Sequence, residues 1–400
     1  MTSSKGAPMF DPDTLPQGPW ILETPAPATV ILAAVSSAVI ESPAAVAQAV
    51  ANVTGADVDL EVQTDDIGDA PWVAVISIPQ LPVPLVCHPE VAPLEGSGLP
   101  EPAVSGAGLV IQTLLHPADP LTAFANLLRL ATVLDPSSPG VLDADTGRWF
   151  DRPVLVDQLL DTDADPREDI LWVVTGVHAD TGHEVCTSGL SRSGRREIAM
   201  TGLDQETVET AADMLGLIAA LTLESSLPEA GQCIEIGPGL VLRVTGDADD
   251  ERTPALLERA DGDGPPVDVI SALSTGTAAV YSTDRATARQ HALTSETWGR
   301  FLDLVEPAMA AGGTCYVEVP WECVTGEDDR REHIWMEVVS RCDQHVLASP
   351  AHEGELVPEL PDEPGRIEAG DVCSWRVILD EEIWTPEHID LLTRHMAERA

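Results

Sequence analysis

Two histidines and a cysteine form the best group of metal-binding side chains in the sequence. His178 and His183 flank the turn-forming residues 179–182, and Cys186 follows three positions later. A turn at 179–182 would fold the segment into a β-hairpin with the two imidazoles opposite each other. Two imidazoles and a thiolate could bind zinc, whose tetrahedral sites take nitrogen and sulfur ligands. An ordinary polar hairpin is the alternative, because Cys186 would point to the other face of its strand from His183.

Three arginines form the most concentrated positive segment of the chain. Arg192, Arg195 and Arg196 surround Gly194. Their guanidinium groups could hold a phosphate or a carboxylate of a partner. Alternatively, they form internal salt bridges that offset part of the excess acid.

A third candidate is a pair of side chains on one predicted strand near the C-terminus. His333 and Trp335 alternate along this strand, with Glu332 and Glu337 nearby. Residues two apart on a strand share a face, so the pair could line a ligand-binding surface. The alternative is that Trp335 is a core aromatic residue and His333 a hydrogen-bonded edge residue.

Familiar catalytic and cofactor motifs fail at their diagnostic positions. The segment 189–193 lacks the final glycine of a serine-hydrolase elbow. The acidic run that begins at Asp161 has Pro166 where a calcium loop needs glycine, and Trp172 where it needs glutamate. Gly237-Pro238-Gly239 lacks the lysine of a phosphate-binding loop. We therefore assign no catalytic residue and expect no cofactor.

The elements that must position these residues are strands and helices in mixed order. Ser42-Pro43, Asp119-Pro120 and Thr385-Pro386 each combine a capping residue with a first-turn proline, which predicts a helix start. Asp204 is predicted to cap a further helix, and 295–310 to form another. Strands are predicted at 29–35, 58–62, 72–78, 109–115, 170–177, 184–188, 269–281, 315–319, 333–340 and 371–379. Residues 234–244 are predicted to form a strand pair that turns at Gly237-Pro238-Gly239. This pattern predicts an α+β protein of two to three mixed units, with largely antiparallel sheets flanked by helices.

Composition shifts divide the chain into four expected segments. Residues 1–27 are rich in proline and glycine and are expected to form a flexible N-terminal arm. An α+β domain is expected over 28–225, and a second α+β unit over 226–314 with an acidic insertion at 246–268. Prolines at 79, 82, 84, 89 and 93 predict no regular element before Leu109. The C-terminal domain is expected over 315–400.

The C-terminal segment resembles a known bacterial domain family. It contains Glu332-His333-Ile334-Trp335, then Ser349-Pro350, Gly370-Asp371 and Ile383-Trp384. This order resembles the YegJ-like domain, in which an E-H-x-W strand precedes an N/S-x-P turn, a G-D turn and a tryptophan-bearing end. The resemblance covers about residues 315–385 and implies no particular activity.

Charge and cysteine content restrict the partners and the compartment. The 400 residues include 21 Lys and Arg against 67 Asp and Glu, for a net charge of −46. Phosphate backbones and anionic lipids need a cationic surface, so we expect neither nucleic acid nor membrane as a direct partner. The apolar run Val30 to Ile40 is too short to span a bilayer. Seven cysteines, an odd number without a CxxC pair, favour reduced thiols in a cytoplasm.

Three functions remain compatible with these observations. The first is a cytoplasmic bacterial protein that binds another protein without catalysis. The second is an enzyme of unrecognised type, with a pocket near the Arg192–Arg196 loop and the His178/His183 hairpin. The third is an acidic decoy that occupies a nucleic-acid-binding protein.

Overall fold

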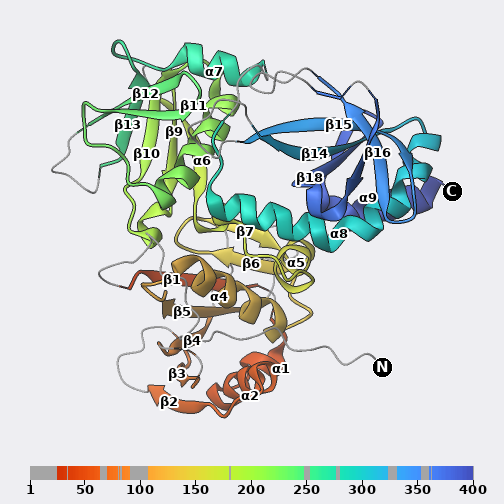
Figure 1. Cartoon of the computed structure of the whole chain (residues 1–400). Helices are drawn as coiled ribbons and strands as arrows, with labels where there is room; N and C mark the ends of the chain where they lie inside the picture. Colours follow the sequence, from red (N-terminus) through yellow and green to blue (C-terminus); the bar gives the residue numbers. More distant parts are fainter. Residues whose placement is uncertain are drawn as a thin grey trace. The chain divides into compact units, whose positions relative to one another are not determined.

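The computed structural model describes residues 25–33, 35–63, 70–79, 81, 83–90, 107–179, 182–246, 253–275, 280–322, 331–352, 360–361 and 363–399, with backbone alone at 322 and 331. The chain divides into two units (Figure 1). Unit 1 contains residues 1–161 and 166–283, and unit 2 contains 162–165 and 284–400. Three mostly antiparallel sheets accompanied by helices confirm the predicted α+β class.

The first sheet of unit 1 is antiparallel throughout its seven strands. Its order is β2-β3-β4-β5-β1-β6-β7. The strands are β1 (Pro27–Leu32), β2 (Asp59–Gln63), β3 (Val73–Ser77), β4 (Leu85–Glu90), β5 (Gly108–Leu114), β6 (Gly140–Asp143) and β7 (Arg148–Asp151). Helices α1 (Ser37–Ile40), α2 (Pro43–Thr54), α4 (Pro120–Leu134) and α5 (Arg152–Leu155) accompany it, and a π-helical turn at Val156–Leu160 follows α5.

Two predicted helix starts are confirmed by their capping hydrogen bonds. The Ser42 side chain accepts a hydrogen bond from the main-chain N–H of Ala45 at the start of α2. Asp119 accepts one from Thr122 at the start of α4. Each cap satisfies an N–H group that has no partner within its helix.

The second sheet of unit 1 has six strands in the order β11-β12-β13-β10-β9-β8. They are β8 (Val173–Ala179), β9 (Gly182–Ser188), β10 (Ile198–Leu203), β11 (Cys233–Gly237), β12 (Leu240–Thr245) and β13 (Ala255–Arg259). Helices α6 (Val208–Glu224) and α7 (Val267–Ser274) and 3₁₀ turns at Glu168–Leu171 and Leu190–Ser193 complete the unit. β10 and β13 are parallel, and the other pairs are antiparallel.

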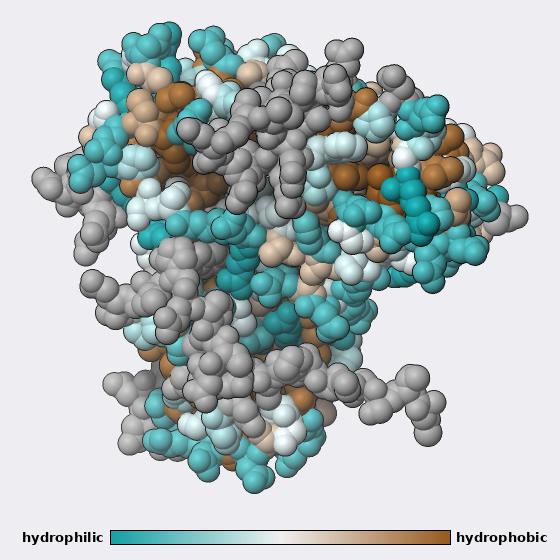
Figure 2. Space-filling view, in the orientation of Figure 1, coloured by the Kyte–Doolittle hydropathy of each residue, from teal (hydrophilic) through white to brown (hydrophobic). Residues whose placement is uncertain are grey.

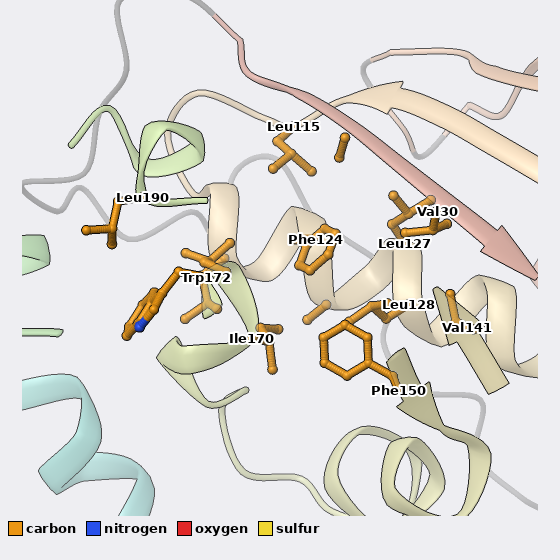
Figure 3. Close-up of a cluster of buried hydrophobic side chains, with 14 of the residues drawn as sticks. Val30, Leu115, Phe124, Leu127, Leu128, Val141, Phe150, Ile170, Trp172 and Leu190 are labelled. Carbon is orange, nitrogen blue, oxygen red and sulfur yellow. The ribbon is translucent and has the colours of Figure 1, made fainter. Parts of the chain in front are cut away.

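One hydrophobic core serves both sheets of unit 1. Figure 3 shows side chains from α4, β6 and β7 close to others from the 3₁₀ segments that flank the second sheet. The labelled residues are Val30, Leu115, Phe124, Leu127, Leu128, Val141, Phe150, Ile170, Trp172 and Leu190. This shared core explains why the first two strand-rich segments form a single unit.

The expected middle unit over 226–314 is not a separate body. Strands β11, β12 and β13 extend the sheet that β8, β9 and β10 begin, so the expected boundary near residue 225 lies inside unit 1. The acidic insertion 246–268 contains β13, whose buried Ala255 and Leu257 alternate with less buried neighbours. The strand expected over 269–281 is wrong, because α7 begins at Val267, directly after Pro265 and Pro266.

Two further expectations for unit 1 are corrected. β4 forms in the proline-rich segment that was expected to hold no regular element. Pro89 is tolerated because β4 pairs with β3 only as far as Cys87, so at Pro89 the strand has β5 as its one partner. Asp204 does not cap α6, since the helix begins at Val208 after a turn in which Thr207 bonds to the Asp204 carbonyl. Most of the expected arm 1–27 lies outside the described residues.

Unit 2 is built on a six-stranded antiparallel sheet in the order β17-β16-β15-β14-β18-β19. The strands are β14 (Thr314–Glu322), β15 (Arg331–Arg341), β16 (His345–Pro350), β17 (Gly365–Glu368), β18 (Ser374–Leu379) and β19 (Glu382–Trp384). Helices α8 (Asp284–Ala310) and α9 (Ile389–Arg399) and 3₁₀ turns at Ala369–Asp371 and Pro386–His388 accompany the sheet. Unit 2 therefore begins before residue 315, because α8 supplies part of its core.

The core of unit 2 lies on one face of this sheet. Trp375 from β18 is fully buried and stacks on Phe301 of α8, with ring centres 4.9 Å apart. Its indole N–H donates to the Thr297 hydroxyl at 2.9 Å.

Among the described residues, no helix is both long and apolar enough to cross a membrane.

Candidate functional site

Arg192 is a buried structural cation of unit 1. Its guanidinium forms a bidentate ion pair with Asp143, the last residue of β6, and reaches Asp145 at 2.8 Å. It also lies over the Phe124 ring, 4.5 Å from the ring centre. Burial alone would lower the pKa of Arg192, but hydrogen bonds and charge from Asp143 and Asp145 raise it. The internal salt bridge was the alternative interpretation of this residue, and the geometry favours it over ligand binding.

Arg195 and Arg196 bind main-chain carbonyls in two different places. Arg195 donates to Leu223 at the end of α6, at 3.0 Å, and burial lowers the pKa of Arg195. Arg196 donates to Thr253 at 2.6 Å. The three arginines of the loop thus tie together different parts of unit 1, and these contacts do not gather them into one anion-binding group.

The hairpin geometry separates the expected zinc ligands. His178 and His183 are direct cross-strand partners in β8 and β9, with ring centres 4.8 Å apart. Cys186 instead pairs with Thr175, and its thiol donates to the carbonyl of Thr187. Successive residues of a strand point to opposite faces of the sheet, so Cys186, three positions after His183, lies on the opposite face. The three-ligand zinc site is therefore wrong, and no group of three metal-ligating residues occurs in the described part of the chain.

The thiols of the described residues are poor nucleophiles where they are buried. Burial raises the pKa of Cys87 and of Cys315 to about 12. Burial, together with the charges of Glu197 and Glu184, raises the pKa of Cys186 to about 11. Thiolate is the reactive form of cysteine, so these three side chains are unreactive at neutral pH.

His333 and Trp335 lie on the face of the unit 2 sheet that points away from Trp375 and Phe301. Opposite residues in antiparallel strands share a face, and the register pairs Trp335 with Glu318 and His333 with Pro320. Tyr316 and Arg376 are partners between β14 and β18 on this same face. We call Tyr316, Glu318, His333, Trp335, Glu337 and Arg376 the outer face of unit 2.

An arginine held against two aromatic rings is the main feature of the outer face. The guanidinium carbon of Arg376 lies 4.1 Å from the centre of the Trp335 ring and 4.9 Å from that of Tyr316. These contacts are cation–π interactions, which hold the plane of the guanidinium in place. The Nε atom of Arg376 is buried and has no hydrogen-bond acceptor among the described residues.

No carboxylate of the described residues forms a direct ion pair with Arg376. Burial lowers the pKa of Arg376, although the charge of Glu318 opposes that effect. Glu318 instead lies 3.7 Å from the Nδ1 atom of His333. The outer face therefore presents a cation whose hydrogen-bonding edge lacks a carboxylate among the described residues.

Sequence reasoning named three members of the outer face and missed Tyr316, Glu318 and Arg376. His333 and Trp335 were predicted as site residues, and the strands that carry Tyr316 and Arg376 were also predicted. The register of β14 against β15 and β18 is what joins them, and it depends on pairing between distant segments.

Comparison of the chain with protein-family models, with curated proteins and with solved structures gives no match. The YegJ-like resemblance of the C-terminal segment remains a hypothesis.

Proposed function

We propose that this protein binds another protein without catalysis, and that the outer face of unit 2 is its contact surface. The observation that carries the proposal is the guanidinium of Arg376 stacked against Trp335 and Tyr316. Tryptophan, tyrosine and arginine are the residue types that contribute most to binding energy at protein interfaces.

The hydrogen-bonding need of Arg376 indicates what the partner supplies. The guanidinium lies over both rings, and its N–H groups donate in its own plane. The buried Nε atom has no acceptor among the described residues, and a buried donor without an acceptor costs about 1–3 kcal/mol. A carboxylate or main-chain carbonyl oxygen of the partner would accept hydrogen bonds from the terminal N–H groups of Arg376.

Net charge favours a cationic partner protein. The chain carries −46, and hydrophilic side chains lie beside apolar areas on the visible face of the described residues (Figure 2). Such a field steers positively charged proteins toward contact and repels nucleic acids. Glu318 and Glu337 on the outer face could then pair with basic side chains of the partner.

Thiol chemistry supports the non-catalytic part of the proposal and its compartment. Cys87 and Cys315 are buried with raised pKa values, which makes them poor nucleophiles. The six cysteines that the structure describes are all free thiols. Free thiols support a reducing compartment such as a bacterial cytoplasm.

An array of short synthetic peptides with basic, acidic and apolar sequences tests the proposal. The full-length protein is expected to bind peptides that combine basic and apolar residues, and Arg376→Glu and Trp335→Ala are expected to lose that binding. Arg366→Glu is the matched control, because Arg366 lies on β17 of the same sheet and pairs with Glu368 in solvent.

Two results would overturn the proposal. One is an array on which no peptide binds the wild-type protein. The other is binding that salt abolishes and that Arg376→Glu retains, since this would indicate diffuse attraction to acidic surface, as in a decoy.

A further inference from the structure

The cross-strand pair of histidines in unit 1 has the geometry of a two-ligand metal site. His178 on β8 and His183 on β9 are directly opposite in the antiparallel register. Side chains of such partners leave the sheet on the same face, with Cβ atoms about 4.5–5.5 Å apart. Their ring centres are 4.8 Å apart and the ring planes are inclined at 57°.

The distance between the rings matches that expected for two imidazoles on one ion. A nitrogen ligand lies about 2.0–2.1 Å from zinc, and the ring centre lies farther out on the same line. With tetrahedral or square angles at the metal, two such rings have centres roughly 5 Å apart. The ring planes are inclined at 57°, so the two imidazoles do not stack on each other.

The β8–β9 hairpin packs against the rest of unit 1 next to the two histidines. Gly176 and Val185 share the face of the histidines, two residues farther from the turn. Val185 is fully buried, and a Cβ placed at Gly176 would lie 3.6 Å from the Val208 side chain at the start of α6. Val185 thus anchors β9, whereas β8 is the exposed edge strand of the sheet. Ligands on paired strands are held more precisely than ligands on loops.

Neither imidazole is engaged elsewhere in the described structure. Among the described residues, each imidazole has the other as its only neighbouring aromatic ring and forms no hydrogen bond or ion pair. His178 is exposed and His183 is half-buried, so an ion can reach them from solvent. Neutral imidazole suits zinc, copper and nickel, whereas calcium and magnesium require oxygen ligands.

We propose that His178 and His183 chelate one divalent transition-metal ion at the end of the β8–β9 hairpin. The ion's other positions are open to water or to a ligand from outside the chain, because no third metal-ligating side chain joins the pair among the described residues. The strongly negative net charge raises the local concentration of cations. The site is independent of the outer face of unit 2.

Calorimetric titration of the full-length, untagged protein with zinc chloride tests the proposal. One zinc site is expected in the wild type, and His178→Ala and His183→Ala are each expected to bind about tenfold more weakly or worse, since each variant loses chelation. His291→Ala is the control, because His291 is an exposed histidine on α8. Zinc is also expected to raise the midpoint temperature of thermal unfolding in the wild type and in His291→Ala, but not in His178→Ala or His183→Ala.

Copper provides a second readout that does not depend on affinity. The electron paramagnetic resonance spectrum of the copper-loaded wild type is expected to show two coordinated nitrogens from His178 and His183, and each single variant is expected to lose one of them. Equal zinc affinity in the wild type and in the His178→Ala variant would overturn the proposal. Absence of zinc binding to the wild type would overturn it too.

Discussion

Arg192 and Asp143 form a bidentate ion pair that is almost completely removed from solvent, with their side chains 4% and 1% exposed. The pair joins the end of β6 to the 3₁₀ turn at Leu190–Ser193 and so connects segments from both sheets of unit 1. Asp143 also accepts a hydrogen bond from the Thr146 hydroxyl. A residue predicted as a ligand for an external anion thus has an internal carboxylate instead.

Removal of one partner from this pair is expected to be costly. Asp143→Ala leaves the Arg192 guanidinium buried without its bidentate acceptor, which should lower the free energy of unfolding by about 3–5 kcal/mol. Urea denaturation of the full chain measures the change. Arg366→Ala, which breaks the exposed pair with Glu368, should cost at most about 1 kcal/mol. Equal losses in the two variants would refute the structural role of the pair.

Acid is expected to weaken unit 1 through Asp135. Burial opposes ionisation of Asp135, but hydrogen bonds from Ser137 and Ser36 outweigh it and lower the pKa of this carboxyl. A lowered folded-state pKa contributes stability that is present above the unfolded-state value of about 3.9 and disappears as pH falls through the folded-state value.

The lowered pKa of Asp135 predicts how a variant without this charge responds to pH. Asp135→Asn should unfold more easily than the wild type near neutral pH, and the difference should shrink as the pH falls below about 4. Thermal unfolding across this pH range measures the effect, with Asp263→Asn at an exposed position as the control. A stability difference between the wild type and Asp135→Asn that grows as the pH falls would contradict a lowered pKa of Asp135.

Cysteine labelling should follow burial. Cys233 is exposed, whereas Cys87 and Cys315 are buried and their pKa values are raised to about 12. A maleimide reagent at neutral pH should modify Cys233 in the native protein, and should reach the other two only after urea unfolds the chain. Peptide mass spectrometry locates the label. Native labelling of Cys87 at the rate of Cys233 would contradict the described core.

Two tryptophans on opposite faces of the unit 2 sheet should separate stability from binding. Trp375 is fully buried against Phe301, so Trp375→Ala should lower the free energy of unfolding by about 3–5 kcal/mol. Trp335 lies on the outer face, and Trp335→Ala should cost roughly 1 kcal/mol. Calorimetric unfolding of both variants checks which substitution lowers the stability more. The reverse order would mean that Trp335 belongs to a core.

Local signals in the sequence predicted many elements of the fold because they act within a few residues. Ser42 and Asp119 cap their helices through N–H groups three positions away. Asp204 failed as a cap because a turn through Thr207 intervenes before α6. β13 and β4 were missed because their stability comes from pairing with distant strands, which outweighs local acid or proline.

The same contrast between local signals and long-range pairing decides which parts of the candidate sites the sequence could predict. The pairing of His178 with His183 was predictable because the turn between them is short. The meeting of Trp335 with Tyr316 and Arg376 was not, because a shift of one residue in the strand register would place them on different faces. The choice of Arg192 as a ligand failed because its partner Asp143 is distant in the sequence.

Hydrogen exchange of the full-length protein, with and without the tightest-binding peptide of the array, tests the central claim most directly. The proposed function predicts that the peptide slows exchange in β14, β15 and β18 around Tyr316, Trp335 and Arg376, and that Arg376→Glu abolishes this protection. Protection confined to the strands of unit 1, or protection that Arg376→Glu leaves unchanged, would contradict the claim that the outer face of unit 2 binds the partner.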